Sequence, residues 1–328
     1  MLSIASMFPI GDHLYPFFDT REACALRLTC QELKQAVTDF PWEDKRTVIK
    51  GSIAKWRECF PKARCANVEQ YDLWLNPQGR RTPVKDEDFA HFAGLLELNM
   101  SRCTRVTSSA FVHLRGIKRL NLSGCGQISL SVALWMLRGS LKVLSVCGLN
   151  ITDAAFAHLK GIEVLNMSGC SGVTDAAFEH LTGIRELDMS GCSQVTITDA
   201  AFEHLVGIQE LNMSFCNQAT ITDAAFDHLK GIKKLFMSGC TQVTDAAFVH
   251  LKGIRTLDMS LCSQEGITDA AFEHLAGIHH LNMSACRQAA ITSSAFEHLR
   301  GIQWLKMEDC SAACILAAMG EGFELVRN

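Results

Sequence analysis

The sequence predicts an α/β solenoid: a right-handed stack of short repeats with a curved parallel sheet on its concave side, helices on its convex side, and a small α-helical module at the N-terminus. Two observations carry this prediction. Asp-Ala-Ala-Phe occurs six times, starting at residues 153, 175, 199, 223, 245 and 269. A strand-like segment, Ile-x-x-Leu-x-Met-Ser-x-Cys, recurs between these copies, and its central leucines are 21 to 24 residues apart. A period of this length is typical of a repeat array.

Each repeat has the pattern of a strand, a turn and a short helix. Leu165 and Met167 alternate, so both point to one face of a strand. Thr152 stands where a helix N-cap belongs, and the Asp after it places negative charge in the first helical turn. Gly161 follows the helix as a C′ glycine does.

One repeat cannot fold alone. Its five large apolar side chains contribute at most ~1.5–3 kcal/mol each, whereas ordering the backbone and side chains costs ~1.5 kcal/mol per residue. Stacking on neighbouring repeats must therefore supply the remaining stability.

The cysteines follow the same period. The chain has 15 of them, an odd number whose spacing is set by the repeat, so we expect buried, reduced thiols and an intracellular location in the cytoplasm or nucleus. No apolar run reaches the ~20 residues of a membrane span. The first 18 residues carry no Lys or Arg before their short apolar stretch, which makes a poor signal peptide.

These residues resemble a known family. Leu-x-x-Leu-x-Leu-x-x-Cys followed by Ile-Thr-Asp and a helix is similar to the cysteine-containing leucine-rich repeat, over roughly residues 60–310. One unit, at 126–147, is irregular: Cys147 comes two positions early and Trp135 replaces the Phe of the helix. Nine cysteines hold the family position, namely Cys103, Cys125, Cys170, Cys192, Cys216, Cys240, Cys262, Cys286 and Cys310.

Residues 8–42 resemble an F-box. Phe8-Pro9 stands for its Leu-Pro opening, Leu28-Thr29-Cys30 for its Leu-x-Cys run, and Trp42 for its closing Trp. The resemblance implies docking to a Skp-type adaptor of a cullin–RING ligase. The alternative is that this segment only caps the solenoid. The residues expected to contact the adaptor are Phe8, Pro9, Leu14, Leu26, Leu28 and Cys30.

The composition favours recognition over catalysis or nucleic-acid binding. The net charge is −4, although residues 45–85 hold ten Lys or Arg and three acids. Motifs for phosphate binding, dinucleotide binding, serine hydrolysis and zinc proteolysis are missing from the sequence. We therefore expect no enzyme activity, no cofactor, no metal, no nucleic acid and no membrane partner.

A candidate target site lies where apolar residues occupy positions that are polar or glycine in most other repeats. These residues are Phe215, Phe236, Leu261 and Trp304. Four cations are expected to frame them and to favour an acidic target protein, namely Lys233, Lys234, Arg255 and Lys306. The alternative is that the four apolar residues are isolated surface hydrophobes.

The sequence thus predicts four segments: residues 1–44 as the F-box-like module, 45–83 as a helix, a capping repeat and an inserted loop, 84–310 as the repeats, and 311–328 as a C-terminal cap. The resemblance implies a non-enzymatic substrate receptor of a ubiquitin ligase, whose concave face binds the target. The alternative function is a protein-interaction scaffold or pathogen effector without a ligase.

Overall fold

The computed structural model of the 328-residue chain describes residues 31–39, 49, 52–68 and 83–320. The chain divides into two compact units, Met1–Ser145 and Val146–Asn328. The adaptor-binding residues expected from the sequence, Phe8, Pro9, Leu14, Leu26, Leu28 and Cys30, lie outside the described residues. The inserted loop expected before residue 83 lies outside them as well.

The described residues of unit 1 include four short strands that pair in chain order and in parallel. The strands are β1 (Cys65–Asn67), β2 (Glu97–Asn99), β3 (Arg119–Asn121) and β4 (Val143–Ser145). The helices are α4 (Gln31–Asp39), α5 (Ile53–Cys59), η2 (Asp86–Phe92), η3 (Ser108–Leu114) and α6 (Leu130–Leu137). Strand β1 pairs with β2, so a repeat unit before residue 69 joins the sheet.

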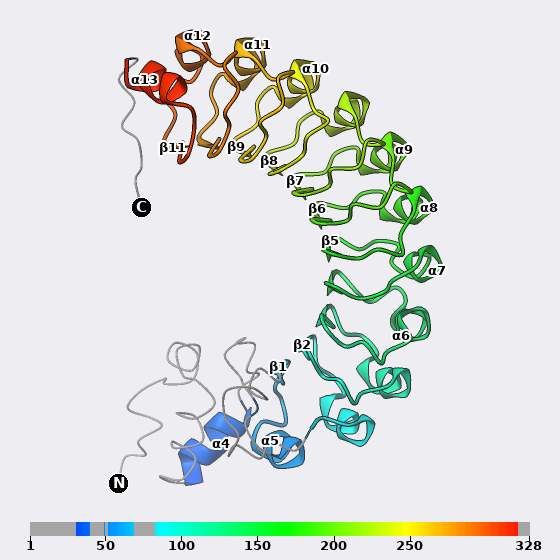
Figure 1. The fold of residues 1–328 in the computed structure, drawn as a ribbon. Coiled ribbons are helices and arrows are strands. Elements are labelled where there is room, and N and C mark those ends of the chain that lie inside the picture. Colours follow the sequence, from blue (N-terminus) through cyan, green and yellow to red (C-terminus); the bar gives the residue numbers. More distant parts are fainter. Residues whose placement is uncertain (1–30, 40–48, 50–51, 69–82, 321–328) are drawn as a thin grey trace, which may run out of the picture. The chain divides into compact units, whose positions relative to one another are not determined.

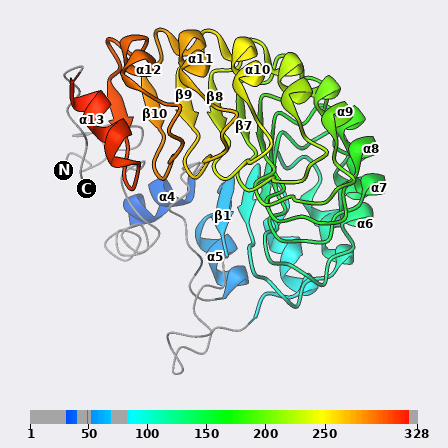
Figure 2. The ribbon, with the colours of Figure 1, turned by 45° about the horizontal axis from the view of Figure 1, so that its top comes forward.

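Unit 2 continues the same plan over seven further strands, each parallel to the next. Within this unit the strands line the inner side of an arc and the helices its outer side (Figure 1), and the tilted view shows the strands side by side (Figure 2). The strands are β5 (Val164–Asn166), β6 (Glu186–Asp188), β7 (Glu210–Asn212), β8 (Lys234–Phe236), β9 (Thr256–Asp258), β10 (His280–Asn282) and β11 (Trp304–Lys306). The predicted solenoid with a parallel sheet is confirmed.

The helices of unit 2 are short, and in five repeats the helical stretch ends two residues before a glycine with positive φ, namely Gly183, Gly207, Gly231, Gly253 or Gly277. Four repeats begin with one α-helical turn over Asp-Ala-Ala-Phe and continue as a 3-10 turn. The α-helices are α7 (Asp153–Phe156), α8 (Asp175–Phe178), α9 (Asp199–Phe202), α10 (Asp245–Phe248), α11 (Asp269–Phe272), α12 (Ser293–Glu297) and α13 (Ala312–Gly320). The 3-10 helices are η4 (Glu179–Leu181), η5 (Glu203–Leu205), η6 (Asp223–Leu229), η7 (Val249–Leu251) and η8 (Glu273–Leu275).

The core consists of identical layers, because each repeat places the same side chains inside. Phe202, Leu211 and Met213 of one repeat are fully buried, and so are Phe226, Leu235 and Met237 of the next. The strand Leu points into the core while its two neighbours on the strand are half-buried or exposed. The alternation read from the sequence therefore sets which residues face solvent.

The Asp of Asp-Ala-Ala-Phe has a role that the sequence did not predict. Its carboxylate accepts hydrogen bonds from the next repeat: Thr222 donates its backbone N–H to Asp199 Oδ1 and its hydroxyl to Asp199 Oδ2, both at 2.7 Å. Thr222 Oγ1 also caps its own helix by accepting from Ala224 N. The same clamp joins Asp153–Thr174, Asp175–Thr198, Asp223–Thr244, Asp245–Thr268 and Asp269–Thr292. The Asp thus ties repeats together, beyond any effect on its own helix.

The repeat cysteines also join neighbouring repeats. Cys216 Sγ donates to Met189 O at 3.1 Å, and Cys240 Sγ donates to Met213 O at 3.1 Å. Burial raises the pKa of the Cys192 thiol to about 11 and that of Cys216 to about 12, so both are neutral thiols near neutral pH. These cysteines act as small buried donors, as their spacing indicated.

The irregular repeat differs from the sequence-based interpretation. Leu134, not Trp135, takes the buried place of the Phe, and Trp135 is 49% exposed. The interval between the cap and Gly139 is one residue longer than in the other repeats and forms the continuous helix α6. A second extra residue, between Gly139 and the strand Leu144, shifts the core position from Trp135 to Leu134. Cys147 takes the place of the strand Ser and accepts a hydrogen bond from Ser168 Oγ at 2.9 Å.

Candidate functional site

A row of left-handed backbone positions runs along unit 2 at the turns that follow the strands. Four of these eight positions are glycine, the residue that adopts this backbone without strain. In chain order the row reads Gly148, Gly169, Gly191, Phe215, Gly239, Leu261, Ala285 and Asp309, all with positive φ. We call these eight residues the turn row.

Two large apolar residues occupy the turn row after β7 and β9. Phe215 has φ of 60° and is 52% exposed, and Leu261 has φ of 61° and is 48% exposed. Each such conformation costs roughly 1–2 kcal/mol relative to right-handed backbone. The neighbouring repeat fixes it, since Phe215 N donates to Ser238 O at 2.7 Å and Leu261 N to Ser284 O at 2.8 Å. Strain held in this way is concentrated at functional sites in proteins.

Gly239 lies between these two residues in the row. A Cβ on Gly239 would meet Phe215 Cδ1 at 3.0 Å and Cε1 at 3.1 Å, so the ring lies over this glycine. Phe236, half-buried on β8, is in register between Asn212 and Asp258. Phe215, Phe236, Leu261 and Ala285 form what we call the apolar ridge. Phe215, Phe236 and Leu261 come from the three successive strands β7, β8 and β9, so they span only ~10 Å across the sheet.

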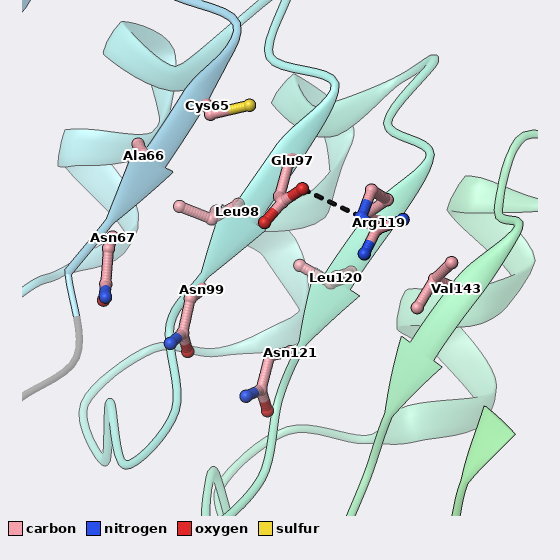
Figure 3. Close-up of a pocket in the computed structure, with 10 residues that line it drawn as sticks. All are labelled: Cys65, Ala66, Asn67, Glu97, Leu98, Asn99, Arg119, Leu120, Asn121 and Val143. Atoms are coloured by element: carbon pink, nitrogen blue, oxygen red, sulfur yellow. Dashed lines mark ion pairs between the residues drawn. The ribbon is translucent and has the colours of Figure 1, made fainter. Parts of the chain in front are cut away.

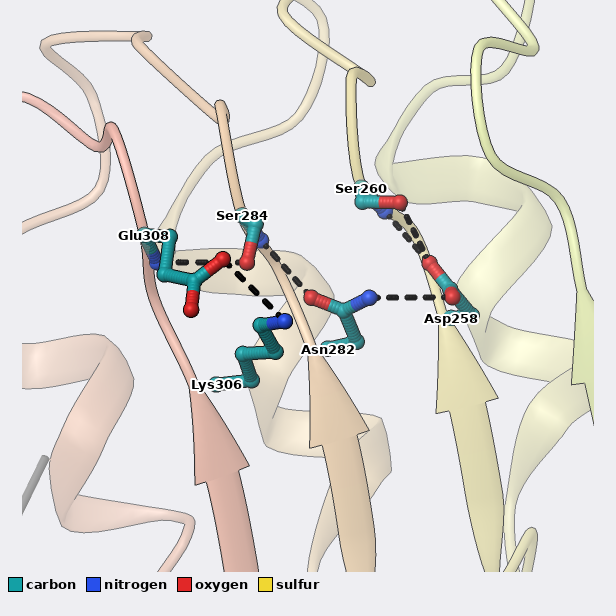
Figure 4. A network of polar contacts seen from close by, with 6 residues as sticks. All are labelled: Asp258, Ser260, Asn282, Ser284, Lys306 and Glu308. Atoms are coloured by element: carbon teal, nitrogen blue, oxygen red, sulfur yellow. Dashed lines mark hydrogen bonds and ion pairs between the residues drawn. The ribbon is translucent and has the colours of Figure 1, made fainter. Parts of the chain in front are cut away.

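A fixed polar network lies beside the ridge (Figure 4). Asp258 accepts from Ser260 N at 2.9 Å, from Ser260 Oγ at 2.6 Å and from Asn282 Nδ2 at 3.0 Å. Asn282 Oδ1 accepts from Ser284 N at 3.1 Å, and Ser284 Oγ accepts from Glu308 N at 3.1 Å. These bonds hold the polar side chains in one arrangement, which lowers the entropy cost of binding a partner.

Two of the four expected cations form ion pairs with carboxylates. Lys234 Nζ pairs with Glu210 Oε2 at 2.8 Å, and that hydrogen bond raises the pKa of the lysine. Lys306 Nζ pairs with Glu308 Oε2 at 3.1 Å. Lys233 and Arg255 directly precede β8 and β9. The positive frame expected from the sequence stays a prediction, and for Lys234 and Lys306 a neighbouring carboxylate offsets the charge.

Trp304, the fourth expected apolar residue, lies apart from the ridge on β11. It is half-buried, and its ring lies against His280 with centroids 6.4 Å apart. The neighbouring strand covers part of the indole and leaves it less exposed than Phe215 or Leu261.

Unit 1 has a hollow of its own on its sheet, about 370 Å³ in volume (Figure 3). Asn67, Asn99 and Asn121 stand in register along it, and Arg119 Nε pairs with Glu97 Oε2 at 2.8 Å. Its exposed groups are polar and partly paired, in contrast to the apolar ridge of unit 2.

Neither a metal centre nor a membrane helix is found in the described part of the chain. It contains no group of three or more His, Cys, Asp or Glu residues that could hold a metal ion. Within the same residues, no helix is long and apolar enough to cross a bilayer.

Comparison with known proteins identifies the repeats. Residues 149–279 match, in six copies, the family described as BspA type leucine rich repeat region. The fold is a leucine-rich-repeat solenoid. Among curated proteins, none matches the chain.

Solved leucine-rich-repeat structures share this fold. A chain of the Toll–Spatzle complex from Drosophila aligns with a TM-score of 0.61 and 15% identity over 83% of this chain and 41% of its own length. A chain of the TLR13–ssRNA13 complex aligns with a TM-score of 0.60 and 17% identity over 83% of this chain and 40% of its own length. The chain thus spans about two fifths of these structures. A chain of the yeast Rad7–Elc1 complex aligns with a TM-score of only 0.42 and 16% identity over 74% of this chain and 84% of its own length. We draw no conclusion from a TM-score this low.

Proposed function

We propose that the chain is a non-enzymatic recognition scaffold that binds a partner protein through the apolar ridge. The observation that carries this proposal is the pair Phe215 and Leu261. Both are half-exposed apolar side chains at backbone positions that favour glycine. Glycine would be less strained and would expose no apolar surface at either position, so the backbone conformation gives no reason to keep the larger residues. Aromatic anchors beside well-ordered polar groups are typical of binding hot spots.

The test of this proposal uses Phe215→Gly and Leu261→Gly in the full chain. Both changes remove an anchor and relieve the strained backbone. We expect a partner to bind the variants at least ~30-fold more weakly, the equivalent of a 2 kcal/mol hot spot. Val206→Ala serves as the control, because Val206 is an apolar residue that is even more exposed, at 65%, and lies at the end of η5 on the helix side. Equal affinity for all four proteins would mean that the ridge residues are isolated surface hydrophobes.

We propose further that this scaffold is the substrate receptor of a cullin–RING ubiquitin ligase. The support is the resemblance of residues 8–42 to an F-box, on Phe8-Pro9 and Leu28-Thr29-Cys30. In such an assembly the N-terminal module would dock the Skp-type adaptor while the repeats hold the target, and the chain would perform no bond chemistry. Its reduced thiols would suit the cytoplasm or nucleus.

Adaptor binding tests this finer proposal independently of the ridge. The full chain should bind a purified Skp-type adaptor at micromolar concentration, and Leu14→Asp with Leu26→Asp should abolish that binding. Phe215→Gly is the matched control and should bind the adaptor normally. A full chain that shows no binding would leave residues 1–44 as a cap, and the function would then be a scaffold without a ligase.

A further inference from the structure

The helix side of unit 1 carries a second exposed apolar surface. Helices η3 and α6 pack side by side there, and a groove of about 470 Å³ is lined by residues from both. Its lining combines three apolar side chains, Val112, Trp135 and Met136, with two guanidinium groups, those of Arg115 and Arg138. We call these five residues the tryptophan groove. They all belong to unit 1 and none belongs to the ridge.

The apolar half of the groove departs from the repeat pattern. Val112 and Trp135 are equivalent, each directly after the buried core residue of its helix, and they are 44% and 49% exposed. Five repeats of unit 2 have an acid at this position, namely Glu179, Glu203, Asp227, Glu273 and Glu297. A half-exposed indole in place of a solvated carboxylate costs solubility, and Val112 and Trp135 are therefore candidate contacts for a partner.

The charge of this region is opposite to that of the chain. Residues 98–152 contain seven Lys or Arg and no Asp or Glu, whereas the whole chain has a net charge of −4. Arg115 and Arg138 occupy equivalent positions before Gly116 and Gly139. The Arg138 guanidinium lies 5.0 Å from the centre of the Trp135 ring. Among the described residues, neither arginine has a carboxylate partner.

We propose that the tryptophan groove binds an acidic segment of a partner protein. Its carboxylates would pair with Arg115 and Arg138, which can each form bidentate hydrogen bonds. An apolar side chain between the carboxylates would pack on Trp135 and Val112. Trp and Arg are the residue types most enriched at binding hot spots. The apolar lining favours a peptide over a nucleic acid, because a phosphate backbone would leave Val112 and Met136 without an apolar partner.

The experiment measures binding of a fluorescein-labelled 12-residue peptide of Glu, Asp, Phe and Leu to the full chain by fluorescence anisotropy. Trp135→Ala should weaken binding at least tenfold, and so should Arg115→Glu combined with Arg138→Glu. The matched control is Val249→Ala with Lys252→Glu. These residues occupy the equivalent positions of the repeat that carries α10, and Val249 is 52% exposed. The control variant should change the affinity for the peptide less than twofold. Trp135→Phe should retain most of the wild-type affinity.

Two competitors separate the parts of the proposal. A peptide with Ser in place of Phe and Leu should bind at least tenfold more weakly, since it keeps only the charge. A 12-nucleotide oligo(U) RNA should compete poorly. The proposal is overturned if the acidic peptide does not bind, if all variants bind it alike, if the Ser peptide binds equally well, or if the RNA binds more tightly and loses affinity in the same variants.

Discussion

The ring of Phe215 lies over Gly239 of the next repeat, with its Cδ1 atom 3.0 Å from the place where a Cβ on Gly239 would stand. The two residues hold neighbouring positions in the turn row, both with positive φ. One repeat therefore supplies the exposed aromatic group, and the next supplies the empty space that the group covers. This pairing links the stability of the repeat stack to the shape of the ridge.

Gly239→Ala tests that pairing. The methyl group would strain the backbone by ~1–2 kcal/mol and push the Phe215 ring from its rotamer, which adds about 0.5–1.5 kcal/mol. Gly191→Ala is the matched control, since Gly191 has φ of 70° in the same row and its Cβ would meet nothing closer than 3.9 Å. Urea unfolding should show a larger loss for Gly239→Ala than for Gly191→Ala. In a Phe215→Ala background the two losses should become equal, and a difference that persists there would argue against the ring contact.

Asp199→Asn tests the clamp between repeats. The change removes a charged acceptor of two hydrogen bonds from Thr222, so the free energy of unfolding should fall by about 1.5–3 kcal/mol. Asp227→Asn is the control, because Asp227 pairs with Lys230 on the exposed helix face and should matter much less. If chemical denaturation shows equal losses of unfolding free energy for the two variants, the clamp does not stabilise the stack more than an exposed ion pair does.

Alkaline pH should destabilise the repeat stack. Burial raises the pKa of Cys125 and Cys192 to about 11 and that of Cys170, Cys216 and Cys262 to about 12, above the ordinary value of 9.0. Above pH 9 a thiol in the unfolded chain loses its proton, whereas the buried thiol in the folded chain stays protonated. The folded state therefore has its full stability below the unfolded pKa and loses stability as the pH rises towards the folded pKa. Between pH 9 and 11 each thiol should thus lower the free energy of unfolding by up to ~1.4 kcal/mol per pH unit.

Unfolding curves at pH 8, 9 and 10 check the thiol prediction. In Cys216→Ala, the free energy of unfolding should fall less steeply with pH, because one of the buried thiols is missing. Iodoacetamide should label few thiols in the native chain and nearly all 15 after denaturation without reductant. Stability that stays constant up to pH 10 would contradict neutral buried thiols, and a mass that shows several disulfides would contradict the reducing compartment.

The sequence was sufficient for the strands, the core layers and the glycine columns, because a period of 21 to 24 residues places Leu165, Met167 and Gly161 by simple alternation and capping rules. It also indicated Phe215 and Leu261, since a glycine column makes any larger residue conspicuous. Contacts between repeats were harder to predict. The Asp199–Thr222 clamp and the Lys234–Glu210 ion pair join residues 23 and 24 positions apart, and only the lateral register of the stack brings them together.

The tryptophan groove escaped prediction for a related reason. Counting nine residues back from the strand Leu144, as in the other repeats, puts Trp135 in the core. One extra residue between Gly139 and Leu144 shifts this position by one, so that Leu134 fills the core and Trp135 is exposed. The charge signal was present in the sequence as the acid-free stretch 98–152, but the net charge of −4 over the whole chain conceals it.

The central claim is that a partner protein contacts the apolar ridge, and photo-crosslinking from position 215 tests it most directly. Benzoylphenylalanine in place of Phe215 preserves an aromatic side chain there. The control carries the same group at Val249, which is also 52% exposed but lies on the helix side. The account predicts that a bound partner crosslinks from position 215 and not from position 249. A partner that binds with unchanged affinity but crosslinks only from position 249, or from neither position, would contradict it.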